Sequence, residues 1–155
     1  MTALYEWPNR AATKLAPDVG DRAAILLLAR ELYVERRRRT RFFDADLFGE
    51  PTWDILLDLY IAAREDRRVP TTSACIGAHV PPTTALRWLR LLEARGLVER
   101  EEDGRDGRRT FVALSPLGMQ TMEAFLGSTR AKLLLGLATF AEAEALAAGV
   151  GLAAE

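Results

Sequence analysis

Residues 83–96 read TTALRWLRLLEARG, and residues 105–111 read RDGRRTF. The first stretch predicts an amphipathic helix that ends at Gly96, a typical left-handed stop. Apolar side chains recur at the spacing of a helix face that packs on a core: Ala85, Trp88, Leu89 and Leu92. The outer face carries hydroxyl and guanidinium groups: Thr83, Thr84, Arg87 and Arg90.

The residues after this helix predict a two-stranded hairpin. The runs LVERE (97–101) and TFVAL (110–114) are short and strand-like, and the segment between them contains two glycines that suit a hairpin loop. Three arginines occupy this loop: Arg105, Arg108 and Arg109. Asp106 lies among them, so the loop has a local positive excess of two charges.

Two helices are expected directly before this unit. Thr52 begins the first, which runs to about Arg64 and has a periodic core face: Trp53, Leu56, Leu57 and Tyr60. The second is short, roughly Thr72 to Ala78, with Cys75, Ile76 and Val80 expected in the interior. The run HVPP (79–82) is a turn, because proline pushes the residue before it out of helical geometry.

Helices are also expected near both ends of the chain. After an extended arm over residues 1–20, Asp21 caps a helix that has apolar residues on more than one side. Ser115 caps another helix, which reaches Gly127, and a last helix follows over about residues 129–148. The last helix is apolar nearly all round, so we expect it to have more than one neighbour.

This order of elements predicts the fold class. Three helices followed by a two-stranded hairpin form the winged variant of the helix-turn-helix. The fold is therefore expected to be mainly α with a small β-hairpin, and 155 residues suffice for one domain with extensions.

Composition and charge narrow the class of protein further. The longest apolar run, LLLGLATFA (133–141), is far shorter than the stretch of about 18 residues that spans a bilayer. The start of the chain lacks the pattern of a secretory signal, and the single Cys75 cannot form an internal disulfide, so the cytoplasm is expected. The net charge of −1 does not indicate nucleic-acid binding, so evidence for such binding must come from the local distribution of charged residues.

Residues 52–126 resemble the MarR-like winged-helix transcription regulators. The resemblance lies in TTSACIGAHVPP (71–82), TTALRWLRLLEARGLVER (83–100) and DGRDGRRTFVALSPLG (103–118). Asp106, Arg108, Ser115 and Gly118 occupy places of that family's wing motif. The resemblance implies a homodimer with a flexible arm (1–20), an N-terminal dimerisation helix (21–48), a winged-helix DNA-binding domain (52–126) and a C-terminal dimerisation helix (128–150).

The resemblance also gives the outward residues their expected roles. Thr83 and Thr84 would contact phosphate or a thymine methyl, and Arg87 would pair with guanine in the major groove, with Arg90 beside it. The wing arginines would enter the minor groove or bind phosphates. Asp106 would orient Arg108 through a salt bridge. A small-molecule effector, for which Tyr33, Phe42 and Trp53 are candidate lining residues, is a further implication.

Other polar features have more ordinary interpretations. The four arginines of 36–39 are spread over about 300° around a helix, so they favour a solvated or ion-paired helix end over a nucleic-acid patch, although phosphate contact by some of them stays open. Cys75 favours inert packing over redox sensing. His79 has no ligand-type neighbours at metal-binding spacing, and no nucleophile motif appears, so neither cofactor, metal site nor enzyme is expected.

The sequence thus predicts a regulator that binds double-stranded DNA as a homodimer and has no contact with membranes. The alternative is a winged-helix module for protein or RNA contacts without sequence-specific DNA binding. The neutral net charge and the acids beside the wing, Glu101, Glu102 and Asp103, favour that alternative.

Overall fold

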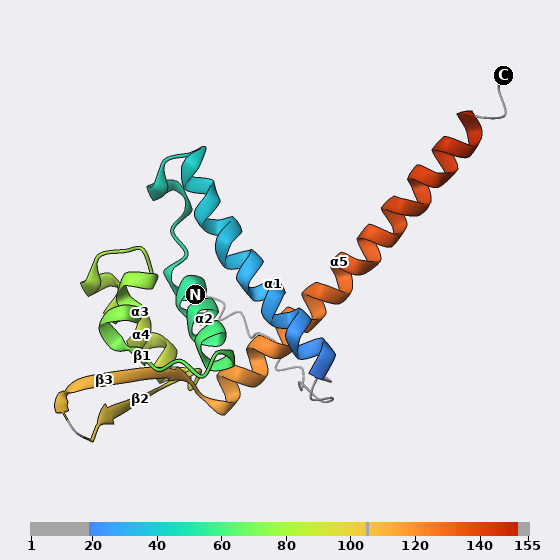
Figure 1. Cartoon of the computed structure of the whole chain (residues 1–155). Helices are drawn as coiled ribbons and strands as arrows, with labels where there is room; N and C mark the ends of the chain where they lie inside the picture. The colour runs from blue at the N-terminus through green and yellow to red at the C-terminus, as the bar shows by residue number, and fades with distance from the viewer. Residues whose placement is uncertain (1–18, 105, 152–155) are drawn as a thin grey trace, which may run out of the picture.

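The computed structural model describes residues 19–104 and 106–151 (Figure 1). The expected arm over residues 1–20 therefore lies outside the described residues, apart from its last two. The helices are α1 (Val19–Arg38), α2 (Pro51–Arg64), α3 (Thr71–Gly77), α4 (Pro82–Ala94) and α5 (Pro116–Gly151). The strands are β1 (Val69–Pro70), β2 (Val98–Asp103) and β3 (Asp106–Leu114), and two short 3₁₀ turns, η1 (Arg39–Arg41) and η2 (Ala45–Phe48), follow α1.

The expected hairpin is part of a three-stranded antiparallel sheet with the order β1-β3-β2. In the hairpin Val98 lies opposite Leu114, and a register shift occurs between Glu102 and Asp103. The third strand, β1, places Val69 opposite Val112 and was not expected from the sequence. It ties the segment after α2 to the root of the wing.

The core lies where α2, α3 and α4 meet the inner side of this sheet. Its largest fully buried side chains come from α2, α4, β1 and α5: Tyr60, Ile55, Leu57, Leu59, Leu89, Leu126 and Val69. Cys75 is buried as expected, but Ile76 is 75% exposed, so its predicted place in the interior is wrong. In a helix of seven residues that packs on one side, adjacent positions 75 and 76 point about 100° apart.

The junction between the wing and α5 is closed by a serine cap and a glycine. The Ser115 hydroxyl accepts a hydrogen bond from the Gly118 N–H (2.9 Å) and donates one to the carbonyl oxygen of Gly96 (2.5 Å). Gly96 itself has a φ of +70°, the left-handed stop expected after α4. A Cβ atom at Gly118 would collide with the carbonyl oxygen of Leu97, so only glycine fits there.

The helix that Ser115 caps does not end at Gly127, which corrects the expected break between two C-terminal helices. α5 runs without a break from Pro116 to Gly151 and is 36 residues long. Gly127 lies against α1, and a Cβ atom at this position would lie 3.8 Å from Cδ1 of Ile25. An interior glycine costs a helix only about 1 kcal/mol, which the packing of α1 on α5 offsets.

The N-terminal helix also differs from its expected extent of 21–48. α1 begins at Val19 and ends at Arg38, and two 3₁₀ turns occupy much of the exposed connection to α2. Asp21 lies inside the first turn and pairs with Arg130 of α5 (3.1 Å), so it joins two helices in addition to favouring the helix start. Arg30 of α1 pairs with Glu65 after α2 (2.7 Å).

The outer half of α5 runs away from the rest of the molecule (Figure 1). Every residue from 131 to 146 is exposed. This segment carries large apolar side chains: Leu133, Leu134, Leu135, Leu137, Phe140 and Leu146. Within the described residues, no helix is long and apolar enough to cross a membrane.

Candidate nucleic-acid interface

The recognition-helix candidate α4 has the two-sided character that its sequence predicts. Ala85, Leu89 and Leu92 face the core with 0–3% exposure, and Trp88 is half-buried. The outer face has the predicted membership, with Thr83, Arg87 and Arg90 exposed and Thr84 half-buried. Pro81 and Pro82 start the helix, where the missing N–H of proline costs no hydrogen bond.

The arginines on this face differ from most others in the described chain. Arg87 and Arg90 make no ion pair with another described residue, and neither does Arg95 at the end of α4. Eight other arginines are paired with carboxylates: Arg30, Arg36, Arg39, Arg64, Arg67, Arg68, Arg100 and Arg130. The outer face of α4 therefore offers guanidinium groups that are available to an external anion.

Arg95 is a further candidate that the sequence pattern did not indicate. It is exposed and follows α4 directly, as the residue before Gly96. The arginine is evident in the stretch EARG (93–96), but the periodic pattern of core and outer residues in this helix ends before position 95. With Arg87 and Arg90 it extends the positive surface along the length of α4.

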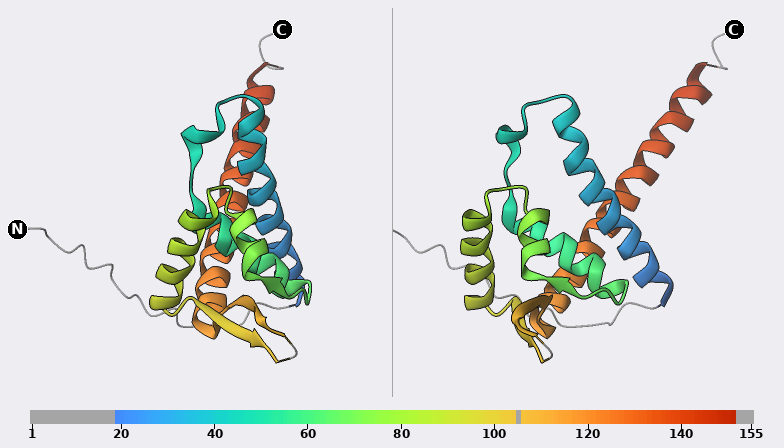
Figure 2. Two further views of the ribbon diagram at one scale, coloured as in Figure 1. Left: turned by 90° about the vertical axis from the view of Figure 1, so that its left-hand side faces the viewer. Right: turned by 60° about the vertical axis from the view of Figure 1, so that its left-hand side comes forward.

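The wing lies at the same end of the molecule as α4. In Figures 1 and 2, α3, α4 and the β2–β3 hairpin are together on the side away from the outer half of α5. Arg109 of β3 is exposed. Arg105 lies outside the described residues, as do the side chains of Asp106 and Arg108, so the expected pair of Asp106 with Arg108 stays a prediction.

Acidic groups accompany the wing, as the sequence indicates. Glu101 and Glu102 are exposed on β2, and Glu101 contacts Arg68 at 3.5 Å. The Arg68 guanidinium also lies 3.8 Å from the centre of the Phe111 ring. Arg68 is thereby held at the root of the wing, where it partly neutralises Glu101.

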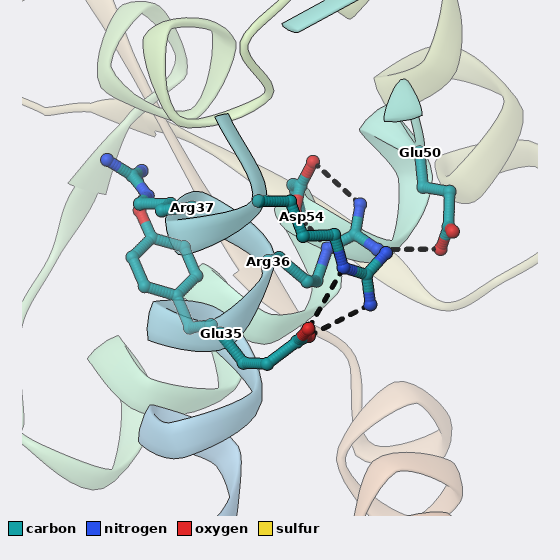
Figure 3. Close-up of polar contacts among 7 residues, drawn as sticks. Glu35, Arg36, Arg37, Glu50 and Asp54 are labelled. Carbon is teal, nitrogen blue, oxygen red and sulfur yellow. Dashed lines mark hydrogen bonds and ion pairs between the residues drawn. The ribbon is translucent and has the colours of Figure 1, made fainter. Parts of the chain in front are cut away.

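The arginine run 36–39 forms an ion-paired helix end (Figure 3). Arg36 contacts Asp54 at 2.6 Å and Glu50 at 2.9 Å, and Arg39 contacts Glu35 at 2.9 Å. The Arg37 guanidinium donates to the Tyr33 hydroxyl and lies 4.3 Å from its ring centre. Three of these four side chains have internal partners, so the predicted interpretation of this run holds.

Cys75 is a packed group, whereas His79 is exposed in the turn after α3 and its imidazole is only partly shielded from water. Burial raises the pKa of the Cys75 thiol, with the nearby Arg100 guanidinium opposing the shift, so the reactive thiolate is disfavoured. Burial, and then the charge of Arg37, lower the pKa of His79, while Asp54 acts the other way. No group of three metal-ligating side chains occurs among the described residues.

Solved structures with the same architecture are regulators of the MarR type. One is a variant of S. aureus MepR bound to an oligodeoxyribonucleotide, with 21% identity over 80% of this chain and 91% of that chain and a TM-score of 0.53. Another is a MepR variant from a multidrug-resistant S. aureus clinical isolate, with 21% identity over 80% and 87% and a TM-score of 0.51. No protein-family model matches this sequence, and neither does any curated protein.

These likenesses establish the fold. The chain has the winged helix-turn-helix architecture with a mainly helical body and a small antiparallel sheet, as its sequence predicts. The resemblance to MarR-like regulators is confirmed at this level.

Proposed function

We propose that the chain is a transcriptional regulator that binds double-stranded DNA as a homodimer, with α4 in the major groove and the β2–β3 wing beside it. The observation that carries this proposal is the exposed face of α4, where Arg87 and Arg90 lack carboxylate partners among the described residues. Arginines held in a structural network are paired, whereas those of a nucleic-acid surface must be free to contact phosphates and bases.

The roles along α4 follow from groove geometry. The major groove is about 12 Å wide and admits one helix, whose N-terminal residues reach the base edges. Thr83 and Thr84 lie in the first turn and contact phosphate or a thymine methyl. Arg87, one turn further, pairs bidentately with guanine, and Arg90 binds the backbone.

The wing supplies the second contact. Arg109 is exposed on β3, and Arg105 and Arg108 flank the loop in sequence. Arginine side chains tolerate the narrow and strongly negative minor groove. Asp106 orients Arg108 in this proposal.

The homodimer is supported by the exposed outer half of α5. Six large apolar side chains between positions 133 and 146 are 50–72% exposed, which is an unusual concentration for the surface of a monomer. A second copy that covers them with its own α5 and α1 forms a two-fold interface. The two α4 helices of the dimer then bind DNA half-sites that are about one helical turn apart. We expect the protein to act in the cytoplasm and to respond to a small-molecule effector.

The acids of the wing support a second candidate, a winged-helix module for protein or RNA contacts. Glu99, Glu101 and Glu102 are exposed on β2, and the net charge is −1. Such a surface repels phosphates unless the arginines of α4 and the wing dominate locally.

Selection of duplexes from a random library, followed by fluorescence anisotropy, tests the proposal. The regulator selects a pseudo-palindromic site and binds it in preference to a scrambled duplex. About four phosphate contacts would weaken the affinity roughly 150-fold between about 50 and 200 mM salt. If no duplex is enriched, and binding to every duplex stays equally weak, the interaction module is the better account.

A further inference from the structure

The helix α4 begins with two adjacent prolines, and both are exposed. Pro81 occupies the N-cap position, with φ −50° and ψ 141°, and Pro82 is the first residue of the helix. An N-cap residue is ordinarily serine, threonine, asparagine or aspartate, because its side chain accepts a hydrogen bond from the first amides of the helix. No side-chain cap hydrogen bond forms at α4. The start of α4 therefore presents apolar rings where a polar cap is usual.

The first turn of α4 also has few free amides. Neither Pro81 nor Pro82 has an N–H group. The amides of Thr84 and Ala85 both donate to the carbonyl oxygen of Pro81, at 2.9 and 3.0 Å. Among the described residues, this leaves Thr83 as the one residue of the turn whose amide has no backbone acceptor. A helix start usually offers several such donors to a phosphate, so the start of α4 is a poor phosphate site.

The outer face of α4 changes its chemistry along the helix. Its start carries two pyrrolidine rings and the γ-methyl group of Thr83, which is also exposed, and it has no acidic residue. The first guanidinium is that of Arg87, one helical turn after Thr83. The face thus offers an apolar surface first and a strong hydrogen-bond donor second.

We propose that Pro81 and Pro82 are specificity-determining residues that select thymine by contact with its C5-methyl group. This inference deepens the proposed function and rests on it. The N-terminal end of a recognition helix is the part that reaches the base edges. In the major groove thymine alone among the four bases presents a methyl group, and apolar side chains recognise it. A pyrrolidine ring offers no hydrogen bond to the polar edge of another base, whose groups would lose water without compensation.

The spacing along α4 indicates where the thymine lies relative to the guanine assigned to Arg87. Arg87 follows Pro81 by six residues, which is about 9 Å along the axis of a helix. This length is roughly the rise of two or three base pairs of DNA. Each half-site is therefore expected to contain a thymine within about three base pairs of that guanine.

Removal of the thymine methyl groups from the DNA tests the contact. The full chain is titrated, by fluorescence anisotropy, with the duplex enriched from a random library and with the same duplex carrying deoxyuridine in place of those thymines. Deoxyuridine pairs as thymidine does and lacks only the methyl group. The affinity should fall about fourfold for each contacted methyl, the value of one buried group of that size.

A third duplex is the control, with deoxyuridine only at thymines outside the half-sites. Its affinity should equal that of the unmodified duplex. Equal affinities for all three duplexes would overturn the proposal. An enriched site without a thymine near the guanine would overturn it as well.

Two proline variants connect the methyl effect to the start of α4. Pro81→Ser replaces the ring by a capping side chain, so it should preserve the stability of the fold while it removes most of the methyl effect. Pro116→Ser also replaces an exposed proline at the start of a helix. Because Ser115 donates to the carbonyl oxygen of Gly96, Pro116 lies near the opposite end of α4, and its variant should keep the methyl effect. A Pro81→Ser protein with an unchanged methyl effect would contradict the assignment.

This inference and the proposed function fail in different ways. If no duplex is enriched, DNA binding itself is wrong and the inference falls with it. If a duplex is enriched and bound with an affinity that ignores the methyl groups, the regulator stands and only the role of Pro81 and Pro82 is wrong.

Discussion

Arg36 and Asp54 form a two-point ion pair, with Nε 2.6 Å from Oδ1 and Nη2 3.2 Å from Oδ2. The two side chains are only 8% and 13% exposed. The pair joins the last turn of α1 to the first turn of α2 across an exposed connection. It therefore fixes how the proposed dimer helix leaves the winged-helix body.

Replacing Arg36 by Met should destabilise the chain by roughly 3 kcal/mol, because the carboxylate of Asp54 would be left buried and unpaired. Urea unfolding measures the loss. The matched control is Arg39→Met, which breaks a solvent-screened pair with Glu35 and should cost much less than Arg36→Met. Similar losses in both variants would show that Arg36 contributes no more than a surface pair.

The periodic core of α4 shows what sequence can predict. Ala85, Leu89 and Leu92 are buried and Arg87 and Arg90 exposed, as the helical spacing of these residues requires. Spacing within one helix is local information, and the left-handed stop at Gly96 is local as well. The helix and its two faces were therefore predictable without a structure.

Features that depend on distant residues were not predictable in this way. The strand β1 forms because Val69 pairs with Val112, which is distant in the sequence. The helix α5 continues through Gly127, where Ile25 of α1 packs against it. Arg87 and Arg90 have no carboxylate partner among the described residues because of where the fold places its acidic side chains. The sequence alone does not give those positions. A groove lined by Trp53 of α2 and Trp88 of α4 likewise needs two helices in place, although Trp53 was already a candidate effector-lining residue in the sequence.

Two glycines of α5 should respond oppositely to substitution by alanine. A Cβ atom at Gly118 would collide with the Leu97 carbonyl oxygen, so Gly118→Ala should destabilise the chain by more than about 2 kcal/mol or prevent folding. In the single chain no other described atom lies within 4 Å of a Cβ atom at Gly136, so Gly136→Ala should stabilise the helix itself by roughly 0.5–1 kcal/mol. Thermal and urea unfolding of the two variants measure these changes in stability. A Gly118→Ala protein as stable as the unaltered chain would contradict the described junction between the wing and α5.

Acidification should weaken the fold through His79. Its folded-state pKa lies below the ordinary value of 6.5, chiefly because of burial, so the unfolded chain binds the proton more readily. The stabilisation is therefore complete above about pH 6.5 and falls as the pH drops toward the folded-state value. The groups that face His79 are Arg37 and Asp54.

His79→Asn tests this dependence, since asparagine tolerates the φ of 52° at this turn and carries no titrating group. The urea midpoint of the unaltered chain should fall more between about pH 7.5 and about pH 5.5 than that of the variant. Parallel slopes would assign the pH dependence to other groups.

The outer half of α5 should hold the proposed dimer together. Leu137 is 65% exposed in the single chain, and Leu137→Glu would bury a carboxylate in a two-fold interface. Light scattering after size-exclusion chromatography should show a dimer for the unaltered chain and a monomer for the variant. Thr121→Glu adds the same charge to the inner half of α5 and should leave the dimer intact. An unaltered chain that elutes as a monomer would refute the homodimer.

The most direct test of the central claim is the duplex affinity of Arg87→Ala compared with that of Arg22→Ala, measured by anisotropy on a selected duplex. Both variants remove one exposed arginine, but Arg22 belongs to the first turn of α1, and this end of α1 lies apart from α4 in Figure 1. The account predicts that Arg87→Ala weakens binding about 5- to 150-fold, the value of one bidentate contact to guanine, while Arg22→Ala binds as the unaltered chain does. Equal affinities for the two variants would contradict the assignment of α4 as the recognition helix.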